Sequence, residues 1–410
     1  MATQTPELPD LPSSRLPAFV FIFITVLLDM LALGIIVPVL PKLIIAFKGG
    51  NTASAATIFG LFETTWAAMQ FVFAPLLGAI SDRFGRRPVI LISTLGLGLD
   101  YFLMAAAPTL GWLLVGRVIS GITSSSYATA FAYIADVTPK EQRAAKYGLL
   151  GAAFGLGFII GPAVGGLLGS ISLRLPFWVA GGLSLLGTAY GYFVLPESLG
   201  ANRRPRVDWR RANPVGALGM LRRHGTMLLG FGIAVLLYRL AHDSFQSLFV
   251  IYSDYRFHWN ARTVGMVFAV IGVASMIVQA GLVRPAVRRL GERTTMMLGF
   301  TFGVICFVIL GIAPTSTLFL LAIPFSALFG LTFPAMQGIM TGLVADDEQG
   351  RLQGAIASLA GMAGIIAPSL FNNVFSLVID RWKGMVLPGT PWFIAAVLLV
   401  GAMVVVGRRA

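Results

Sequence analysis

Charged side chains interrupt several long apolar runs of this chain. They are Asp29, Glu63, Asp100, Arg117, Arg239 and Asp243. A charge at the depth of a bilayer costs at least about 2.5 kcal/mol on insertion scales, so each such residue is expected to serve a function. Because four acids face two bases, not all four carboxylates need be ionised together. This surplus of acids is what the uptake and release of protons would require.

Two of these charges are expected to pair across a tight turn. Pro108-Thr109 lies midway between Asp100 and Arg117. In an antiparallel hairpin both residues then sit at similar depth, about 13 Å below the turn at 1.5 Å per residue. We predict that they neutralise one another, either as part of proton coupling or as a static ion pair that fixes helix packing.

The other intramembrane charges also have two interpretations each. Arg239 and Asp243 are four residues apart, hence on one helix face and able to pair locally. His242, beside them, either hydrogen-bonds locally or carries protons. Asp29, near the middle of the first apolar run, either carries protons or makes an interhelical hydrogen bond.

The elements that must position these charges are membrane helices. The chain has 410 residues, of which 57% are hydrophobic and 11% charged, and a mean hydropathy of +0.83. Soluble domains carry about 25% charged residues, which excludes an ordinary soluble domain. A β-barrel would alternate polar and apolar residues over segments of about ten, and residues 149–172 show no alternation. We predict an all-α membrane protein.

Polar breaks divide the apolar sequence into twelve predicted transmembrane helices in two halves of six. The first six lie at 18–38, 56–80, 88–107, 110–135, 145–170 and 175–195. The second six lie at 226–251, 261–283, 294–313, 316–344, 352–379 and 386–407. The predicted organisation is an N-terminal tail (1–17), a first half (18–195), an Arg-rich linker (196–225) and a second half (226–407).

The distribution of basic residues predicts the orientation. The net charge is +13, and 21 of the 30 Lys and Arg lie on the side that holds both termini and the linker, with 7 on the other side. By the positive-inside rule both termini are cytoplasmic and the chain is a multi-pass protein of the inner (plasma) membrane. The basic residues separate apolar segments instead of forming a face, so we expect no nucleic-acid partner. The first apolar run lacks the features of a signal peptide and is expected to remain as a helix.

A degenerate repeat relates the two halves. The segment Asp82-Arg83-Phe84-Gly85-Arg86-Arg87 has an echo in Arg288-Arg289-Leu290-Gly291-Glu292-Arg293, about 206 residues later. Parallel repeats of this kind build a central binding site at the repeat interface of secondary transporters.

Several motifs together give a family resemblance. The loop from Gly78 to Pro88 reads GAISDRFGRRP, and the fifth predicted helix carries Gly148, Gly157, Gly161, Pro162, Gly165 and Gly166 at characteristic spacing. Further matches are Leu28-Asp29, Gly116-Arg117, Pro196-Glu197-Ser198, Arg256-Phe257-His258-Trp259 and residues 349–354 (QGRLQG). From end to end the chain resembles the major facilitator superfamily, in particular its drug/proton antiporters and the tetracycline/proton antiporters among them.

The resemblance implies roles for particular residues. Asp82 and Arg86 match the family's cytoplasmic gate, with Asp136 as a further partner, and Asp29 matches its helix 1 aspartate. The glycines and Pro162 match its antiporter motif. Independently of the family, glycines four apart such as Gly157 and Gly161 form a strip without side chains that lets another helix approach closely. Plain helix packing is the alternative role of any one of them.

The chain also departs from the tetracycline exporters. Those pumps carry a functional aspartate at about the position of Gly303, whereas Glu63, Arg239 and Asp243 are additions of this chain. An arginine with its own aspartate favours a ligand with a carboxylate and an apolar body over a metal-chelated tetracycline. Polar residues at span centres are the remaining candidates for substrate binding, and any of them can instead be an interhelical hydrogen bond. Besides Arg239, the candidate substrate-binding residues are Gln70, Tyr127, Gln246, Gln337, Asn372 and Asn373.

The predicted function is proton-coupled export of small amphipathic organic molecules by a monomer that alternates access between its halves. Its energy source is the proton gradient, with no cofactor and no metal. The alternatives are a proton symporter or facilitator for an organic anion and, from another class, a non-transporting membrane sensor, which would be expected to carry an added soluble domain. No phosphate-binding Gly-Lys-Ser/Thr loop occurs, and the three His and single Cys are scattered, so we expect no enzyme.

Overall fold

The computed structural model describes residues 15–124, 127–199, 216–223, 225–345, 348–382 and 387–407. The described residues form helices and contain no strand. Residues 1–14 of the predicted tail and residues 200–215 of the predicted linker lie outside this part of the chain.

Each predicted span corresponds to one helix or to a set of consecutive helices. The spans of the first half are α1 (Arg15–Ile36) with α2 (Leu40–Phe47), α3 (Thr52–Phe84), α4 (Arg86–Ala106), α5 (Leu110–Thr123) with α6 (Tyr127–Val137), α7 (Lys140–Ile171) and α8 (Leu175–Val194). A short 3-10 turn (Gly216–Leu218) and α9 (Gly219–Arg223) precede the second half.

The second half continues with longer and more broken helices. They are α10 (Gly225–Phe257), α11 (Ala261–Ile277), the π-helical turn η4 (Val278–Leu282), α12 (Val283–Ile312), α13 (Ser316–Leu320), α14 (Ala322–Phe329), α15 (Thr332–Gly342), α16 (Gln349–Asp380) and α17 (Thr390–Gly407). The continuous stretch Ala261–Ile312 is 52 residues long and holds the eighth and ninth predicted spans.

The helices in the described ranges are long enough to confirm the all-α membrane fold. Ten helices could cross a bilayer by length and composition, one of them the 52-residue stretch, and Leu110–Thr123 is a shorter apolar helix in the fourth predicted span. Together these elements account for the twelve predicted spans.

Equivalent residues start and end equivalent helices in the two halves. The side chain of Asn51 accepts the Ser54 amide at the start of α3, and Asn260 accepts the Thr263 amide at the start of α11. Gly85 and Gly291 follow at the other ends with φ of 106° and 78°, a region in which a side chain is strained. The sequence echo therefore has a backbone counterpart.

Breaks interrupt the first and tenth spans where the sequence disfavours a continuous helix. The α1 helix ends before Pro38, since proline disfavours the helical conformation of the residue before it, and Pro41 lies in the first turn of α2. The tenth span is broken between α14 and α15, where the Gln279 amide of η4 donates to the Gly330 carbonyl at 3.2 Å. The sequence predicted neither break, because each span is apolar throughout.

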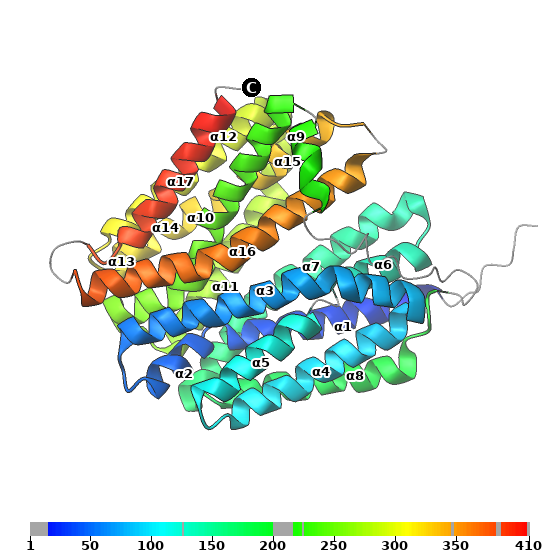
Figure 1. Cartoon of the computed structure of the whole chain (residues 1–410), viewed down its shortest axis with the longest axis horizontal. Helices are drawn as coiled ribbons and strands as arrows, with labels where there is room; N and C mark the ends of the chain where they lie inside the picture. The colour runs from blue at the N-terminus through cyan, green and yellow to red at the C-terminus, as the bar shows by residue number, and fades with distance from the viewer. Residues whose placement is uncertain are drawn as a thin grey trace, which may run out of the picture.

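The helices pack as two bundles that meet along two seams (Figure 1). Within the first bundle α1 packs on α7 and α8, and within the second α10 packs on α16 and α17. Between the bundles α3 packs on α16, and α7 packs on α11. We call the side at which α3 and α17 end the basic side, and the other the opposite side. In Figure 1 α3 and α16 run beside one another and separate toward the end at which α6 and α9 lie.

Candidate functional site

Arg117 binds an acid from a neighbouring helix in the middle of the first bundle. Its Nη2 donates to Glu63 Oε1 at 2.8 Å, and its guanidinium lies 5.2 Å from the centre of the Trp66 ring. Asp100 is near enough to interact with Arg117 electrostatically, yet no ion pair within 4 Å joins them. The predicted Asp100–Arg117 pair is therefore wrong in this structure. Both α3, which carries Glu63, and α4, which carries Asp100, pack on α5, and the guanidinium binds the acid of α3.

Asp100 is buried without a hydrogen bond. It is 1% exposed, and neither of its oxygens has a partner in the part of the chain that is described. Ser120 is close, but its hydroxyl donates to the Gly116 and Arg117 carbonyls of its own helix. Arg117 Nε is also buried without a partner. A carboxylate in such a place carries a desolvation cost that no hydrogen bond offsets.

Asp29 completes this cluster from α1. It is 5% exposed, and no hydrogen bond to it occurs among the described residues. Tyr101, whose hydroxyl also lacks a partner, lies within electrostatic range of Asp29, Asp100 and Arg117. Tyr101 thus lies between the carboxylate of α1 and the Asp100–Arg117 region of α4 and α5.

One face of α10 carries the polar residues of the second bundle. Arg239, Asp243 and Gln246 follow one another at helical spacing, and Gln246 is exposed. The Arg239 Nη2 to Asp243 Oδ1 distance is 3.9 Å, a loose contact, and Arg239 Nε is buried without a hydrogen bond among the described residues. Gln246 Nε2 lies 3.5 Å from His242 Nε2. The Arg239 side chain is 32% exposed and so retains donors for another group.

Aromatic rings line this polar face. Tyr238 stacks on His242 with ring centres 5.8 Å apart and on Phe333 at the same separation. Phe329 lies 5.0 Å from Tyr238 and 2.5 Å from the place that a Cβ at Gly303 would occupy. An aspartate at Gly303 would therefore displace the Phe329 ring, which agrees with the lack of a carboxylate at this position.

The remaining polar candidates fall into different places. Gln70 lies near Ser124 at 3.4 Å, and Gln337 donates to Gln353 at 3.0 Å. Asn372 is fully buried and donates to the Pro368 carbonyl at 2.9 Å. Asn373 instead lies on the exposed stripe of α16 that also carries Ile366, Leu370 and Leu377, so the structure does not bring it to the other candidates. The side chain of Tyr127 lies outside the described part of the chain.

The glycines of α7 allow two different helices to approach. A Cβ at Gly157 or Gly165 would overlap α1 at Met30 or Ile35, and one at Gly161 would lie 2.7 Å from Gly34 Cα. On another face, a Cβ at Gly166 would lie 2.5 Å from the Ala261 carbonyl oxygen of α11. The predicted strip without side chains thus serves both the first bundle and a seam between bundles. Gly148 faces open space.

The predicted gate residues form a network inside the first bundle. Arg86 Nη1 contacts Asp82 Oδ1 at 2.5 Å, and Arg86 Nε contacts Asp136 Oδ2 at 3.2 Å. Glu197 Oε1 accepts the backbone N–H of Arg86 at 2.9 Å. Sequence reasoning did not give Glu197 this position at the start of α4. Its only signal was the Pro196-Glu197-Ser198 match.

Among the described residues, the contacts along both seams lie at the opposite side and in the middle of the bundles. On the first seam Thr64 Oγ1 donates to the Ile365 carbonyl and lies 2.8 Å from Ser369 Oγ. On the second, Gly265 and Gly272 approach the backbone of α7. Toward the basic side, added Cβ atoms on the helices of the two seams would meet nothing within 4 Å at Gly78, Gly148, Gly155, Gly281 and Gly350. The bundles are therefore closed at the opposite side and apart at the basic side.

An ion pair joins the bundles at the closed side. Lys42 Nζ of α2 donates to Asp254 Oδ1 of α10 and also to the Trp259 carbonyl at 2.5 Å. Lys42 is 10% and Asp254 is 28% exposed. The two residues lie 212 positions apart near the equivalent ends of the first and seventh spans. Sequence reasoning missed them because both lie outside the apolar runs.

Removing one partner of this pair should weaken the closed arrangement. We expect Lys42→Met to lower the free energy of unfolding by about 2 to 3 kcal/mol, less than the 3 to 5 kcal/mol of a fully buried pair, because Asp254 keeps some contact with water. The measurement is unfolding of the purified protein by a denaturing detergent, with Lys48→Met as control. In the double variant Lys42→Met/Asp254→Asn, the loss of unfolding free energy should be smaller than the sum of the losses in the two single variants. Additive losses would show that the two side chains are not coupled.

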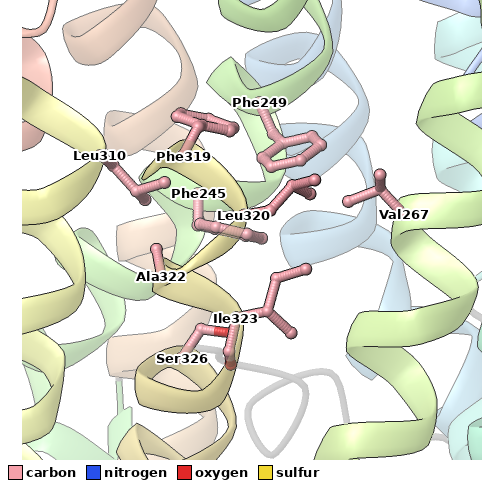
Figure 2. Close-up of a pocket in the computed structure, with 9 residues that line it drawn as sticks. All are labelled: Phe245, Phe249, Val267, Leu310, Phe319, Leu320, Ala322, Ile323 and Ser326. Atoms are coloured by element: carbon pink, nitrogen blue, oxygen red, sulfur yellow. The ribbon is translucent and has the colours of Figure 1, made fainter. Parts of the chain in front are cut away.

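A small apolar pocket lies within the second bundle (Figure 2). Phe245, Phe249 and Phe319 surround it, with aliphatic residues of α11, α12 and α14. Its volume of about 10 Å³ is that of a single water molecule. In this conformation it is too small for an organic ligand.

Comparison with known proteins places this geometry in a family. The family model described as Major Facilitator Superfamily matches residues 22–368. Tetracycline resistance protein, class C, of Escherichia coli is 36% identical over 393 residues, 96% of this chain and 97% of that protein. The class H protein of Pasteurella multocida is 36% identical over 386 residues, 93% of each.

Solved structures share the fold. The human organic anion transporter MFSD10 (TETRAN) has a TM-score of 0.70 at 22% identity, with 97% of this chain and 100% of that one covered. The nucleoside transporter NupG has a TM-score of 0.75 at 14% identity, with 96% and 99% covered. With two bundles joined along α3–α16 and α7–α11, and with relatives alike over nearly their whole length, this chain is a multi-pass membrane protein that belongs to the Major Facilitator Superfamily.

Proposed function

We propose that the chain is a proton-coupled exporter of small amphipathic organic molecules. The observation that carries this proposal is the group of acids in the first bundle, in which Glu63 binds Arg117 while Asp29 and Asp100 are buried without a hydrogen bond among the described residues. Such an excess of acids within the membrane-spanning helices can change its charge state only by exchanging protons. The tetracycline resistance proteins, which are similar over nearly the whole chain, support export. No chemical step is needed, so the protein is not an enzyme, and the proton gradient takes the place of a cofactor.

The orientation follows from the basic residues. We place the basic side, with both termini, in the cytoplasm of a cell whose inner membrane holds the protein as a monomer. The present structure is then open toward the cytoplasm and closed outside. Alternating access requires a second state in which Lys42 leaves Asp254 and the cytoplasmic ends of the seams close.

The test of export is the sign of the coupling. Protein reconstituted into liposomes with an acidic interior and a trapped pH dye receives 2-naphthylacetate, its amide, or tetracycline with magnesium. An exporter should release internal protons while the probe accumulates. Movement of probe and protons in the same direction would establish the symporter instead. If no probe moves and the gradient persists, the proposal of proton-coupled export fails for these amphipathic classes.

The gate residues should affect rate and not affinity. Asp82 and Arg86 lie at the open basic side, away from the buried charges at mid-depth. We expect Asp82→Asn and Arg86→Ala to slow transport by at least about tenfold, or 1.4 kcal/mol, because the closed state of the basic side loses a contact. Equilibrium binding of the probe should change by less than about twofold. Equal loss of binding and transport would remove these residues from the gate.

Arg239 is proposed to select the substrate. Its loose contact with Asp243 and its unused donors suit a carboxylate, while Tyr238 and Phe333 provide an apolar wall. We expect Arg239→Gln to weaken 2-naphthylacetate binding by about tenfold or more, as loss of a charge-assisted hydrogen bond would, without changing binding of the amide. Thermal stability of each variant provides the folding control. Magnesium-dependent tetracycline transport that survives Arg239→Gln would contradict this selectivity.

A further inference from the structure

Three arginines surround an open hollow on the basic side of the second bundle. Arg284, Arg288 and Arg289, with Pro285, line it from the first turns of α12, between the π-turn η4 and the kink at Gly291. All three arginines are exposed. Because their spacing is four and five residues, their side chains project from neighbouring parts of one short helical segment.

These arginines have no partner in the described ranges of the chain. None of them takes part in a hydrogen bond or ion pair there. The nearest acid in sequence is Glu292, which would be expected to pair with Arg288 four residues earlier. Its carboxylate instead lies against Gly338 of α15. Three positive charges thus share one hollow without a protein anion.

The repeat provides an internal comparison. Arg288 stands where the first half has Asp82, and Glu292 stands where it has Arg86. In the first half the arginine is bound by Asp82 and Asp136, and the backbone start of α4 by Glu197. The second half has an arginine, Arg288, in place of the acid Asp82, and Arg288 makes no ion pair or hydrogen bond with the described residues. The hollow is therefore a feature of the second half and not a consequence of the fold.

Apolar side chains next to the hollow indicate its depth in the membrane. Ile277 is 59%, Leu282 is 44% and Leu290 is 49% exposed. In a membrane protein these exposed side chains lie against lipid. Exposed arginines next to exposed apolar side chains are typical of the boundary where the acyl chains end and the headgroups begin. The hollow therefore offers both cationic donors and an apolar surface to a ligand.

We propose that Arg284, Arg288 and Arg289 bind the phosphate of an anionic phospholipid from the leaflet on the basic side. Guanidinium groups bind phosphate through paired N–H donors, and juxtamembrane basic clusters attract anionic lipid with about 1 kcal/mol per residue. The lipid chains lie along Ile277 and Leu282. This site goes beyond the proposed transport function and does not depend on which molecule is exported.

The test compares two double variants of equal charge. Arg284→Gln/Arg288→Gln removes two arginines of the hollow. Arg222→Gln/Arg223→Gln removes two exposed arginines of the basic side elsewhere. The full-length protein is placed in phosphatidylcholine nanodiscs with increasing phosphatidylglycerol, and bound phosphatidylglycerol is counted by native mass spectrometry after release. Thermal stability is followed in the same titration.

We expect the hollow variant to bind phosphatidylglycerol about tenfold to thirtyfold more weakly than the wild type, and the control variant within about twofold of it. Inorganic phosphate and glycerol 3-phosphate at millimolar concentration should neither stabilise the protein nor displace the lipid. Equal losses in both variants would show a diffuse surface charge and overturn the site. Stabilisation by inorganic phosphate as strong as by the lipid would assign the hollow to a soluble anion and likewise overturn the proposal. The binding measurement does not depend on transport, so its outcome tests the lipid site separately from the proposal of export.

Discussion

Replacing Gly265 with leucine should abolish net transport while the protein still folds. A Cβ at this position would overlap the Pro162 carbonyl oxygen and lie 3.0 Å from Gly166 Cα. Both atoms belong to the backbone of α7 and cannot rotate away. The second seam could then not close at the opposite side, and the transporter would remain in the state that is open there.

A mirror-image variant is expected to arrest the other state. Gly148 and Gly155 lie on the same face of α7 as Pro162 and Gly166, since seven-residue and four-residue steps return to one side of a helix. At present they face open space. We expect closure of the basic side to bring this stretch of α7 toward the end of α11. Gly155→Leu should then prevent that closure and keep the present state. To arrest the transporter in either state, a variant must change the free-energy difference between the two states by about 5.5 kcal/mol, which moves their populations from 1:99 to 99:1.

The two arrested states are distinguishable by labelling. Cys306 is 2% exposed, and it is the one cysteine of the chain, so an introduced cysteine supplies the reactive thiol. Ser369→Cys reports on the closed side and Gln353→Cys on the open side. Gly265→Leu should raise the labelling of Cys at position 369 and lower the labelling of Cys at position 353. Gly155→Leu should leave the cysteine at position 369 protected. Gly182→Leu on α8, also in open space but away from both seams, is the control. Transport that persists in either seam variant would show that the glycines only fill space.

The sequence predicted the architecture because its signals are local. Apolar runs and the bias of basic residues reveal spans, and Asn51, Gly85, Asn260 and Gly291 mark helix ends at equivalent places. The breaks after α1 and between α14 and α15 are different. They depend on proline and on a hydrogen bond between Gln279 and Gly330 from another helix, which no apolar run discloses.

The sequence predicted which residues belong to the candidate site, but not which of them contact one another. Intramembrane charge identified Glu63, Asp100 and Arg117, yet depth alone could not choose which acid the arginine binds, because three helices supply groups at similar depth. The sequence did not indicate the Lys42–Asp254 contact for a related reason: the two residues are 212 positions apart and lie at helix ends outside the apolar runs, where charges are common. Polarity likewise could not separate buried Asn372 from exposed Asn373, whose positions depend on the rotation of α16.

Replacing Asp29 with asparagine should abolish accumulation of substrate against its gradient. The carboxylate is 5% exposed, has no hydrogen bond among the described residues, and shares Tyr101 as a neighbour with Asp100. Asparagine keeps the shape of the protonated acid but cannot exchange a proton. Binding should therefore remain within about threefold of wild type, while proton-driven accumulation falls by at least about 100-fold, the range associated with loss of a positioned proton-transfer group.

The assay must separate coupling from movement. Asp29→Asn should still exchange internal for external 2-naphthylacetate when both sides are at the same pH, because that exchange requires no net proton transfer. Asp380→Asn, which removes an exposed carboxylate at the end of α16, is the matched control and should accumulate the probe as the wild type does. Full accumulation by Asp29→Asn would place the essential proton on another member of the cluster. Glu63→Gln and Asp100→Asn would then show which of the two remaining acids carries the proton. Glu63 binds Arg117 directly, whereas the carboxylate of Asp100 has no hydrogen-bond partner among the described residues.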